Sequence, residues 1–166
     1  MTKAMKMWVF ILLIMVIAAC QPSVPLPPTG IPLDVIARQV MTQFFADLNN
    51  AQYEDAALHY GGSYEELQYF NPDVDAADKV TLLKAGCEVN GLLCMQLMTA
   101  EQVSVEGGLI FHYKVSYRAP DGTEFVLGPC CGASETEMPP VRYFDVTVRC
   151  NNDDVCLVLD LPPYVP

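Results

Sequence analysis

The chain has 166 residues, of which 20 are acidic and 9 are basic, and its formal net charge is -11 at pH 7. Nucleic acid and anionic lipid headgroups are therefore poor partners, because binding to phosphate needs clustered lysine and arginine side chains. The length suits one ordinary domain with a buried core.

The first segment of the chain has the pattern of a secretory signal. Residues 7–19 are wholly apolar and follow Lys3 and Lys6, which is the order of charged and apolar regions in such signals. The run ends at Cys20, and it is shorter than the roughly 20 apolar residues that a membrane-spanning helix needs. Residues 1–19 are therefore predicted to be an export signal.

The residues at the end of this segment resemble the lipobox of bacterial lipoproteins. Ile17-Ala18-Ala19-Cys20 offers an aliphatic residue, two small residues and a cysteine. The resemblance implies cleavage before Cys20 and transfer of a diacylglyceryl group to its thiol, with acyl chains such as palmitate holding the protein at the cell membrane or outer membrane, outside the cytoplasm. Two or three chains anchor a protein firmly. A plain signal peptide with an incidental cysteine is the alternative.

A tether is predicted between the lipid and the folded domain. Residues 20–33 are rich in proline and carry no charge, a composition that favours a semi-rigid spacer of about 3.1 Å per residue. Residues 34–162 are expected to fold as one domain, and residues 163–166 to form a C-terminal tail.

The first part of the domain predicts helices. Apolar residues recur every four positions from Ile36 onward, and Asp34 can cap this first helix. Ser63 and Glu66 have the spacing of a capping box, and Gly86 suits a helix C-terminus. Three shorter helices are predicted at residues 51–60, 63–70 and 75–86.

The second part of the domain predicts five strands, at residues 94–105, 109–118, 123–127, 141–150 and 155–161. Short connections between them favour an antiparallel meander. The strand at 109–118 alternates between an apolar set, which includes Tyr113, and a polar set, which includes His112. Helices followed by hairpin-connected strands predict an α+β domain with the helices on one face of the sheet.

This layout resembles the NTF2-like (SnoaL, cystatin-like) superfamily, and bacterial lipoproteins of that build. The likeness is carried by residues 40–62 (VMTQFFADLNNAQYEDAALHYGG), a long helix followed by a short one, and by the strands from Met95 onward. It implies a cone in which N-terminal helices pack on a curved antiparallel sheet. Enzymes of this superfamily use aspartate, tyrosine or histidine side chains that line the cone, tuned by burial.

His59 is the candidate for such acid–base chemistry. It ends the second predicted helix, next to Tyr60 and near Tyr53 and Asp55. A cation is also favoured at a helix C-terminus by the helix dipole, so capping is the alternative role. The aromatic residues of this region either line a small-molecule pocket or form part of the core; they are Tyr53, Tyr60, Tyr64, Tyr69 and Phe70.

Six cysteines remain once Cys20 is assigned to lipid, and an even number in an oxidising compartment predicts disulfides. Cys150 and Cys156 flank a turn and are expected to bridge a hairpin. Two schemes are open for the other four, which are Cys87, Cys94, Cys130 and Cys131. Either the first two pair locally and leave the adjacent two as neighbours, or crossed bonds tie the first two to the adjacent pair.

The sequence contains no motif that requires a cofactor, and the cysteine spacings differ from those of structural zinc sites. The first hypothesis is a non-catalytic binding module, anchored at the membrane through its lipid, whose partner is a small molecule or an envelope protein. An NTF2-like enzyme acting on a small molecule in the cone is the alternative. A third hypothesis is an envelope metal-binding protein that uses Cys130 and Cys131, because thiolates suit copper(I) or zinc.

Overall fold

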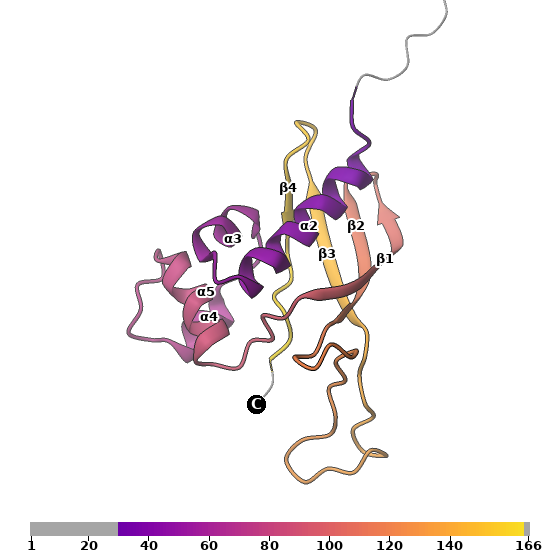
Figure 1. The fold of residues 1–166 in the computed structure, drawn as a ribbon. Helices are drawn as coiled ribbons and strands as arrows, with labels where there is room; N and C mark the ends of the chain where they lie inside the picture. The colour runs from indigo at the N-terminus through magenta and orange to yellow at the C-terminus, as the bar shows by residue number, and fades with distance from the viewer. Residues whose placement is uncertain (1–29, 165–166) are drawn as a thin grey trace, which may run out of the picture. The chain divides into compact units, whose positions relative to one another are not determined.

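Four helices precede four strands in the computed structural model, which describes residues 30–164 (Figure 1). The predicted signal, Cys20 and nearly all of the predicted tether lie outside the described residues. The elements are α2 (Leu33–Asn49), α3 (Tyr53–His59), α4 (Glu65–Phe70), α5 (Lys79–Glu88), β1 (Leu97–Glu106), β2 (Ile110–Tyr117), β3 (Phe144–Cys150) and β4 (Cys156–Val158). The predicted α+β class is confirmed.

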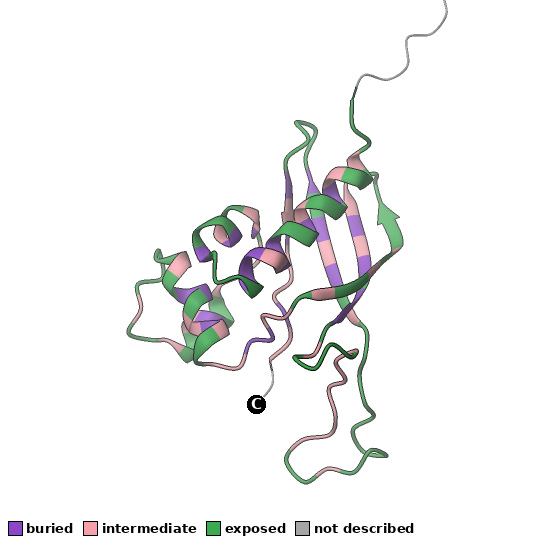
Figure 2. Cartoon of the chain, viewed as in Figure 1, coloured by how far each residue is buried: buried purple, intermediate pink, exposed green. Residues whose placement is uncertain are grey.

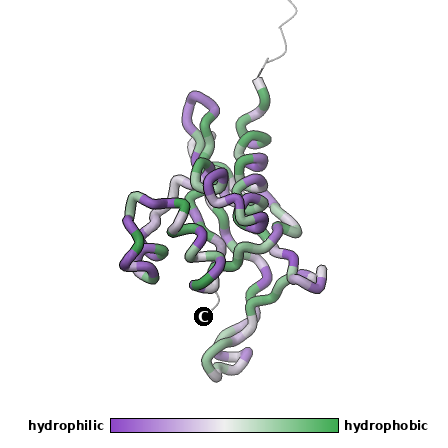
Figure 3. Tube along the Cα trace, turned by 60° about the vertical axis from the view of Figure 1, so that its left-hand side comes forward, coloured by the Kyte–Doolittle hydropathy of each residue, from purple (hydrophilic) through white to green (hydrophobic). Residues whose placement is uncertain are grey.

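Helix α2 follows the predicted apolar period. Ala37, Met41, Phe44 and Leu48 are buried and stand three to four residues apart, which places them on one face of the helix. Figure 3 shows hydrophobic and hydrophilic residues alternating along this helix. Asp34 lies inside the first turn and does not cap it; there its charge favours the helix N-terminus through the dipole.

Three of the predicted helix ends differ in the structure. The expected capping box is wrong: the Ser63 hydroxyl accepts a hydrogen bond from the Glu65 backbone N–H at 3.1 Å, and α4 begins there. Helix α5 begins at Lys79, capped by Asp78. Gly86 is buried inside α5, where a Cβ atom would lie 2.6 Å from a methyl carbon of Leu67 in α4. This glycine allows close helix packing and does not end the helix.

The sheet is an open antiparallel meander in the order β1-β2-β3-β4. Tyr113 of β2 stands opposite Val146 of β3, and both are buried. The predicted alternation of β2 is confirmed, because its apolar set faces the core. The pairing of β1 with β2 shifts register twice, between Leu97 and Thr99 and between Gln102 and Ser104.

The predicted strand at residues 123–127 is wrong. Within this stretch the structure shows only isolated bridges, from Glu124 to Arg118 and from Leu127 to Val141. Residues 118–143 form a long excursion that leaves the sheet after β2 and returns at β3 (Figure 1). Pro120 and Pro129 flank residues 123–127, and because prolines cannot donate to a ladder they limit the length of any strand between them.

The core lies between α2 and the sheet, and Figure 2 shows buried residues along both. The rings of Phe45 and Tyr117 meet edge to face at 5.7 Å. Met41, Phe44, Phe45, Tyr113 and Tyr117 have no accessible surface. Since a void large enough for water would leave accessible surface, these side chains fill the space around them.

The C-terminal segment packs on the same unit. Tyr164, which falls in the predicted tail, forms an antiparallel bridge with Leu92. The Leu93 N–H donates to the Pro163 carbonyl at 2.9 Å. This segment therefore lies beside the chain that links α5 to β1.

Candidate functional site

A cleft of about 740 Å³ opens between α4 and α5, which lies within the range of roughly 300–1,000 Å³ for small-molecule sites. Aromatic and apolar side chains dominate its wall, together with one cation and one acid. The lining residues are Tyr64, Glu65, Gln68, Tyr69, Pro72, Ala76 and Lys79.

The wall of this cleft is held by interactions between the two helices. The Lys79 ammonium lies 4.3 Å from the centre of the Tyr64 ring, a cation–π arrangement. The Gln68 amide donates to the carbonyls of Asn71 and Val74 at 3.0 and 2.9 Å. These bonds fix the connection between α4 and α5, so the cleft is formed before a ligand arrives.

The ring of Tyr64, in the wall of the cleft, contacts aromatic rings that lead into the core. Tyr64 meets Tyr60 edge to face at 5.0 Å, and Tyr60 stacks on Phe44 at 5.5 Å. Burial raises the pKa of Tyr64 to about 12, and burial likewise raises the pKa of Tyr60 above its usual range. Both phenols are therefore neutral at physiological pH.

Two exposed aromatic residues adjoin the cleft. Tyr69 is 79% exposed and its ring contacts that of Phe70 at 5.2 Å. Phe70 in turn lies 5.5 Å from Tyr164. Aromatic side chains on a surface, next to a cleft, are typical of binding sites.

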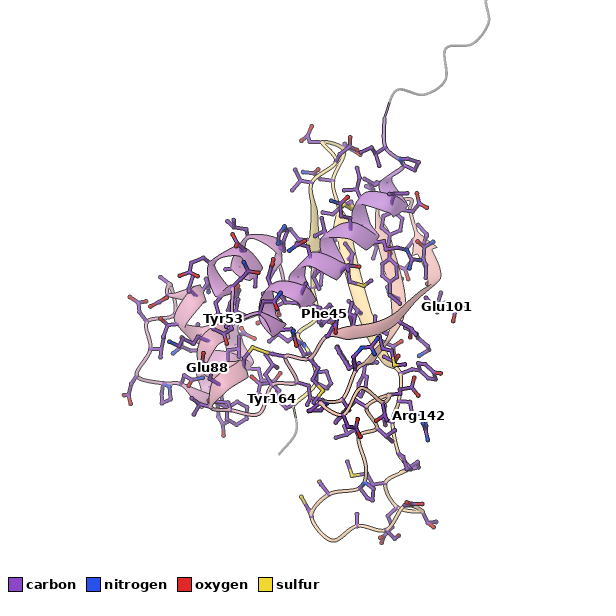
Figure 4. The ribbon with its side chains drawn as sticks, in the orientation of Figure 1. Phe45, Tyr53, Glu88, Glu101, Arg142 and Tyr164 are labelled. Carbon is purple, nitrogen blue, oxygen red and sulfur yellow. A yellow bond between two sulfur atoms is a disulfide. The ribbon has the colours of Figure 1, made fainter. Side chains whose placement is uncertain are left out.

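Helices α3 and α5 are joined behind the cleft. Tyr53 of α3 donates a hydrogen bond to a carboxylate oxygen of Glu88 in α5 at 3.2 Å (Figure 4). Burial raises the pKa of Tyr53, and this bond adds to the rise. The contact keeps α5 in place against the rest of the helical layer.

A second hollow, of about 590 Å³, lies between α4 and the C-terminal segment. Its wall is acidic, with Glu66, Asp145 and Asp160 among the lining residues. Asp160 accepts a hydrogen bond from the Thr147 backbone N–H at 2.7 Å. Asp160 therefore has a structural partner already, and it helps fix the chain that follows β4.

The predicted candidate His59 meets a carboxylate that sequence reasoning missed. Its Nδ1 atom lies 3.4 Å from a carboxylate oxygen of Asp47, which is 1% exposed at the end of α2. The other Asp47 oxygen accepts from the Gln43 amide at 2.7 Å. The signal was present in the spacing, because Asp47 follows Phe44 by three residues on the buried face. A catalytic role for His59 stays a prediction.

The second histidine lies on the sheet. The Nε2 atom of His112 is 3.3 Å from a carboxylate oxygen of Glu106, and its side chain is partly exposed. This arrangement agrees with the polar face of β2. The structure does not bring His112 and His59 together, since they lie on β2 and α3.

The structure contains two disulfides among the described residues. Cys150 and Cys156 stand opposite each other on β3 and β4 and are bonded, which confirms the predicted hairpin bridge. Cys87 is bonded to Cys94, so the local scheme is confirmed and the crossed scheme is wrong. This bond ties the end of α5 to the segment that precedes β1.

The remaining described cysteines, Cys130 and Cys131, are unpaired and lie in the excursion of residues 118–143. Their sulfur atoms are 2.9 Å apart. The hydrogen bond between the two thiols raises the pKa of Cys130. Within residues 30–164, no group of three or more His, Cys, Asp and Glu side chains is placed to hold a metal ion.

Comparison with known proteins gives no relative for this chain: no protein-family model, no curated protein and no solved structure matches it. None of the helices in the described part of the chain has the length and apolar character needed to cross a bilayer. The candidate sites therefore rest on the geometry above.

Proposed function

We propose that the chain is a non-catalytic binding module, anchored outside the cytoplasm by lipid on Cys20, which takes a small ligand in the cleft between α4 and α5. The observation that carries the proposal is the preformed cleft with its Tyr64 and Tyr69 wall. The lipobox-like residues 17–20 support the anchor. The NTF2-like cone remains part of this proposal as the fold that the element order favours.

The lining residues indicate the chemistry of the ligand. Tyr69 and Pro72 offer flat apolar surface, and Lys79 offers the cation of the cleft. Aromatic walls with a few placed polar groups are typical of small-molecule sites. We propose a planar ligand that carries a carboxylate or another anionic group, which the Lys79 ammonium would bind.

A screen of aromatic carboxylates by ligand-observed NMR tests this site. Compounds that bind the purified full-length chain should lose binding in Tyr69→Ala and in Lys79→Ala. Tyr143→Ala is the matched control, because Tyr143 is also an exposed tyrosine but lies outside the cleft. Binding that is equal in all variants, or no binding at all, would count against the cleft.

The anchor is tested separately by cell fractionation and intact-mass spectrometry. We expect the native protein in the membrane fraction, with a lipid-modified cysteine at its amino terminus. The Cys20→Ala variant should lose the added lipid mass. An unmodified terminus in the native protein would remove the anchor from the proposal and leave the cleft untouched.

An acid–base enzyme is the second candidate, and the Asp47–His59 pair is the observation that favours it. A carboxylate beside a histidine can fix the orientation of the imidazole ring. Because the side chains between α2 and the sheet are fully buried, we propose that such chemistry would occur outside this packed part of the core. Turnover of a small-molecule panel by the wild type, lost in His59→Ala, would favour this candidate over the binding module.

A further inference from the structure

Two consecutive turns bend the end of the 118–143 excursion back on itself. The Ala133 N–H donates to the Cys130 carbonyl at 3.0 Å, and the Met138 N–H donates to the Ser134 carbonyl at 2.9 Å. The Glu137 carboxylate accepts from both the N–H and the hydroxyl of Ser134 at 2.8 Å. These local bonds fold residues 130–138 into a small closed loop.

The closed loop gathers three sulfur atoms. The two thiols of Cys130 and Cys131 are 2.9 Å apart, and the thioether sulfur of Met138 lies 3.5 Å from the Cys130 backbone nitrogen. Cys131 adopts a left-handed backbone with φ of 60°, which belongs to the first turn. Cys131 and Met138 are both exposed, and Cys130 is half-buried. The two thiols are thus in contact, and the Met138 thioether sulfur lies beside the Cys130 backbone.

The charge of the excursion favours a cation. No lysine, arginine or histidine occurs between Arg118 and Arg142, whereas this stretch contains Asp121 and three glutamates. At the base of the excursion, Arg142 lies 3.4 Å from Glu124 (Figure 4). The loop that carries the sulfurs therefore has no positive side chain of its own to repel a metal ion.

We propose that Cys130, Cys131 and Met138 form a binding site for a single copper(I) ion. Thiolate and thioether sulfurs are soft ligands and select copper(I) among the common biological cations. Zinc fits this site less well than copper(I), because zinc is usually bound by four nitrogen, sulfur or oxygen ligands in a tetrahedron. Glu137, an acid of the same loop, already accepts hydrogen bonds from Ser134.

Binding is a ligand exchange without electron transfer. Copper(I) forms bonds to the two cysteine sulfurs, the two thiol protons pass to buffer, and the thioether donates a lone pair without losing a proton. The resulting centre carries a net charge of minus one from one cation and two thiolates. The two sulfurs have to separate from their present contact, and the exposed Cys131 side chain can do so by changing rotamer. Because the protons compete with the metal, affinity should rise with pH.

The test is an anaerobic competition between the copper(I) chelator bicinchoninic acid and the full-length chain with Cys20→Ala and with both disulfides intact, after a thiol count has found two free sulfhydryls. We expect one copper(I) per chain. Replacing Cys130 and Cys131 by serine should abolish competition, and Met138→Leu should weaken binding about tenfold, a change of about 1.4 kcal/mol. Met98→Leu is the matched control, because Met98 is an exposed methionine of β1, and it should bind like the wild type.

Several results would overturn the site. These are no copper(I) binding by the Cys20→Ala chain, binding that survives the double serine variant, or a count of no free sulfhydryl in protein purified under argon. Equal binding by Met138→Leu and wild type would remove the third ligand. X-ray absorption of the copper-loaded chain should show sulfur neighbours, and a shell of nitrogen or oxygen alone would contradict the assignment. None of these outcomes depends on the α4–α5 cleft.

Discussion

The β3–β4 hairpin and the 118–143 excursion each carry two cysteines close in sequence, yet they use them differently. Cys150 and Cys156 face each other across paired strands, are buried and form a disulfide. Cys130 and Cys131 are adjacent in a turn, Cys131 is exposed and Cys130 half-buried, and neither is in a disulfide. In the hairpin, the ladder places the two Cβ atoms face to face, which brings the two thiols within bonding distance.

The two regions also differ in how they are stabilised. The hairpin belongs to a sheet whose inner face packs on α2, so its residues are held by long-range contacts. The loop at residues 130–138 is held by hydrogen bonds between neighbours in sequence. Changes in the core should therefore affect the whole domain, while changes in the loop should stay local.

The largest difference is expected from the same substitution made in the core, on which the hairpin packs, and in the excursion. Met41→Ala removes a fully buried side chain of α2 and should lower the free energy of unfolding by about 2–5 kcal/mol, because a cavity remains. Met138→Ala, in the loop, should change it by less than about 0.5 kcal/mol. Urea unfolding of both variants measures this. Equal losses would show that the loop is part of the cooperative core.

Removing each cysteine pair gives the next largest effect. Replacing Cys150 and Cys156 by alanine should cost about 2 kcal/mol, the value expected for so short a closed loop. Replacing Cys130 and Cys131 by alanine should leave the thermal midpoint close to that of the wild type, because no crosslink is lost. Calorimetry of the two double variants makes the comparison. A lower midpoint for the loop variant would contradict the assigned pairing.

A third effect is expected at alkaline pH. Burial raises the pKa of Tyr117, and the charge of Asp160 raises it further, whereas the unfolded phenol titrates near 10.0. The proton thus stays on the folded form longer than on the unfolded form. Stability from this group is complete below pH 10 and falls above it, by up to about 1.4 kcal/mol per pH unit.

Unfolding measured between pH 8 and 11 tests this sign. Tyr117→Phe should flatten the decline above pH 10. Because the Tyr117 hydroxyl is buried without a hydrogen-bond partner, the variant should lose little stability at pH 7. Tyr143→Phe is the matched control, because Tyr143 is an exposed tyrosine and the last residue of the excursion. An unchanged alkaline decline in Tyr117→Phe would contradict the assigned shift.

The smallest effect on stability is expected from cutting the excursion. A glutamate-specific protease should cleave after Glu135 or Glu137, which are exposed in the loop, before it cleaves after Glu65 or Glu66 in α4. The nicked chain should unfold close to the midpoint of the intact one. First cleavage within α4 would reverse the assumed order of local stability.

Much of the fold follows from local patterns in the sequence. The period of α2 and the alternation of β2 place their apolar residues on the core side, as the buried Phe44 and Tyr113 show. Residues 123–127 are predicted as a strand because their composition is similar to that of strands. A strand must pair with a partner over several residues, and the prolines and glycines that flank residues 123–127 limit such pairing. Pairing with a partner is not visible in local composition.

Less of the candidate sites than of the fold could be predicted from the sequence. His59 was found, but its partner Asp47 belongs to another helix, and only the arrangement of α2 and α3 brings them together. Helices α4 and α5 approach each other closely at Gly86, which the sequence predicts as a helix end. The approach of Met138 to Cys130 depends on two turns whose hydrogen bonds involve Ser134 and Glu137.

The two register shifts of β1 affect the unpaired edge of the sheet. This strand is ten residues long and forms the outer edge next to β2, where unused backbone groups invite another chain to add on. Bulges twist such an edge out of line, and Glu101 and Glu106 add charge to it. We expect these features to let a domain with several exposed valines stay monomeric at high local concentration, which the proposed lipid anchor would create.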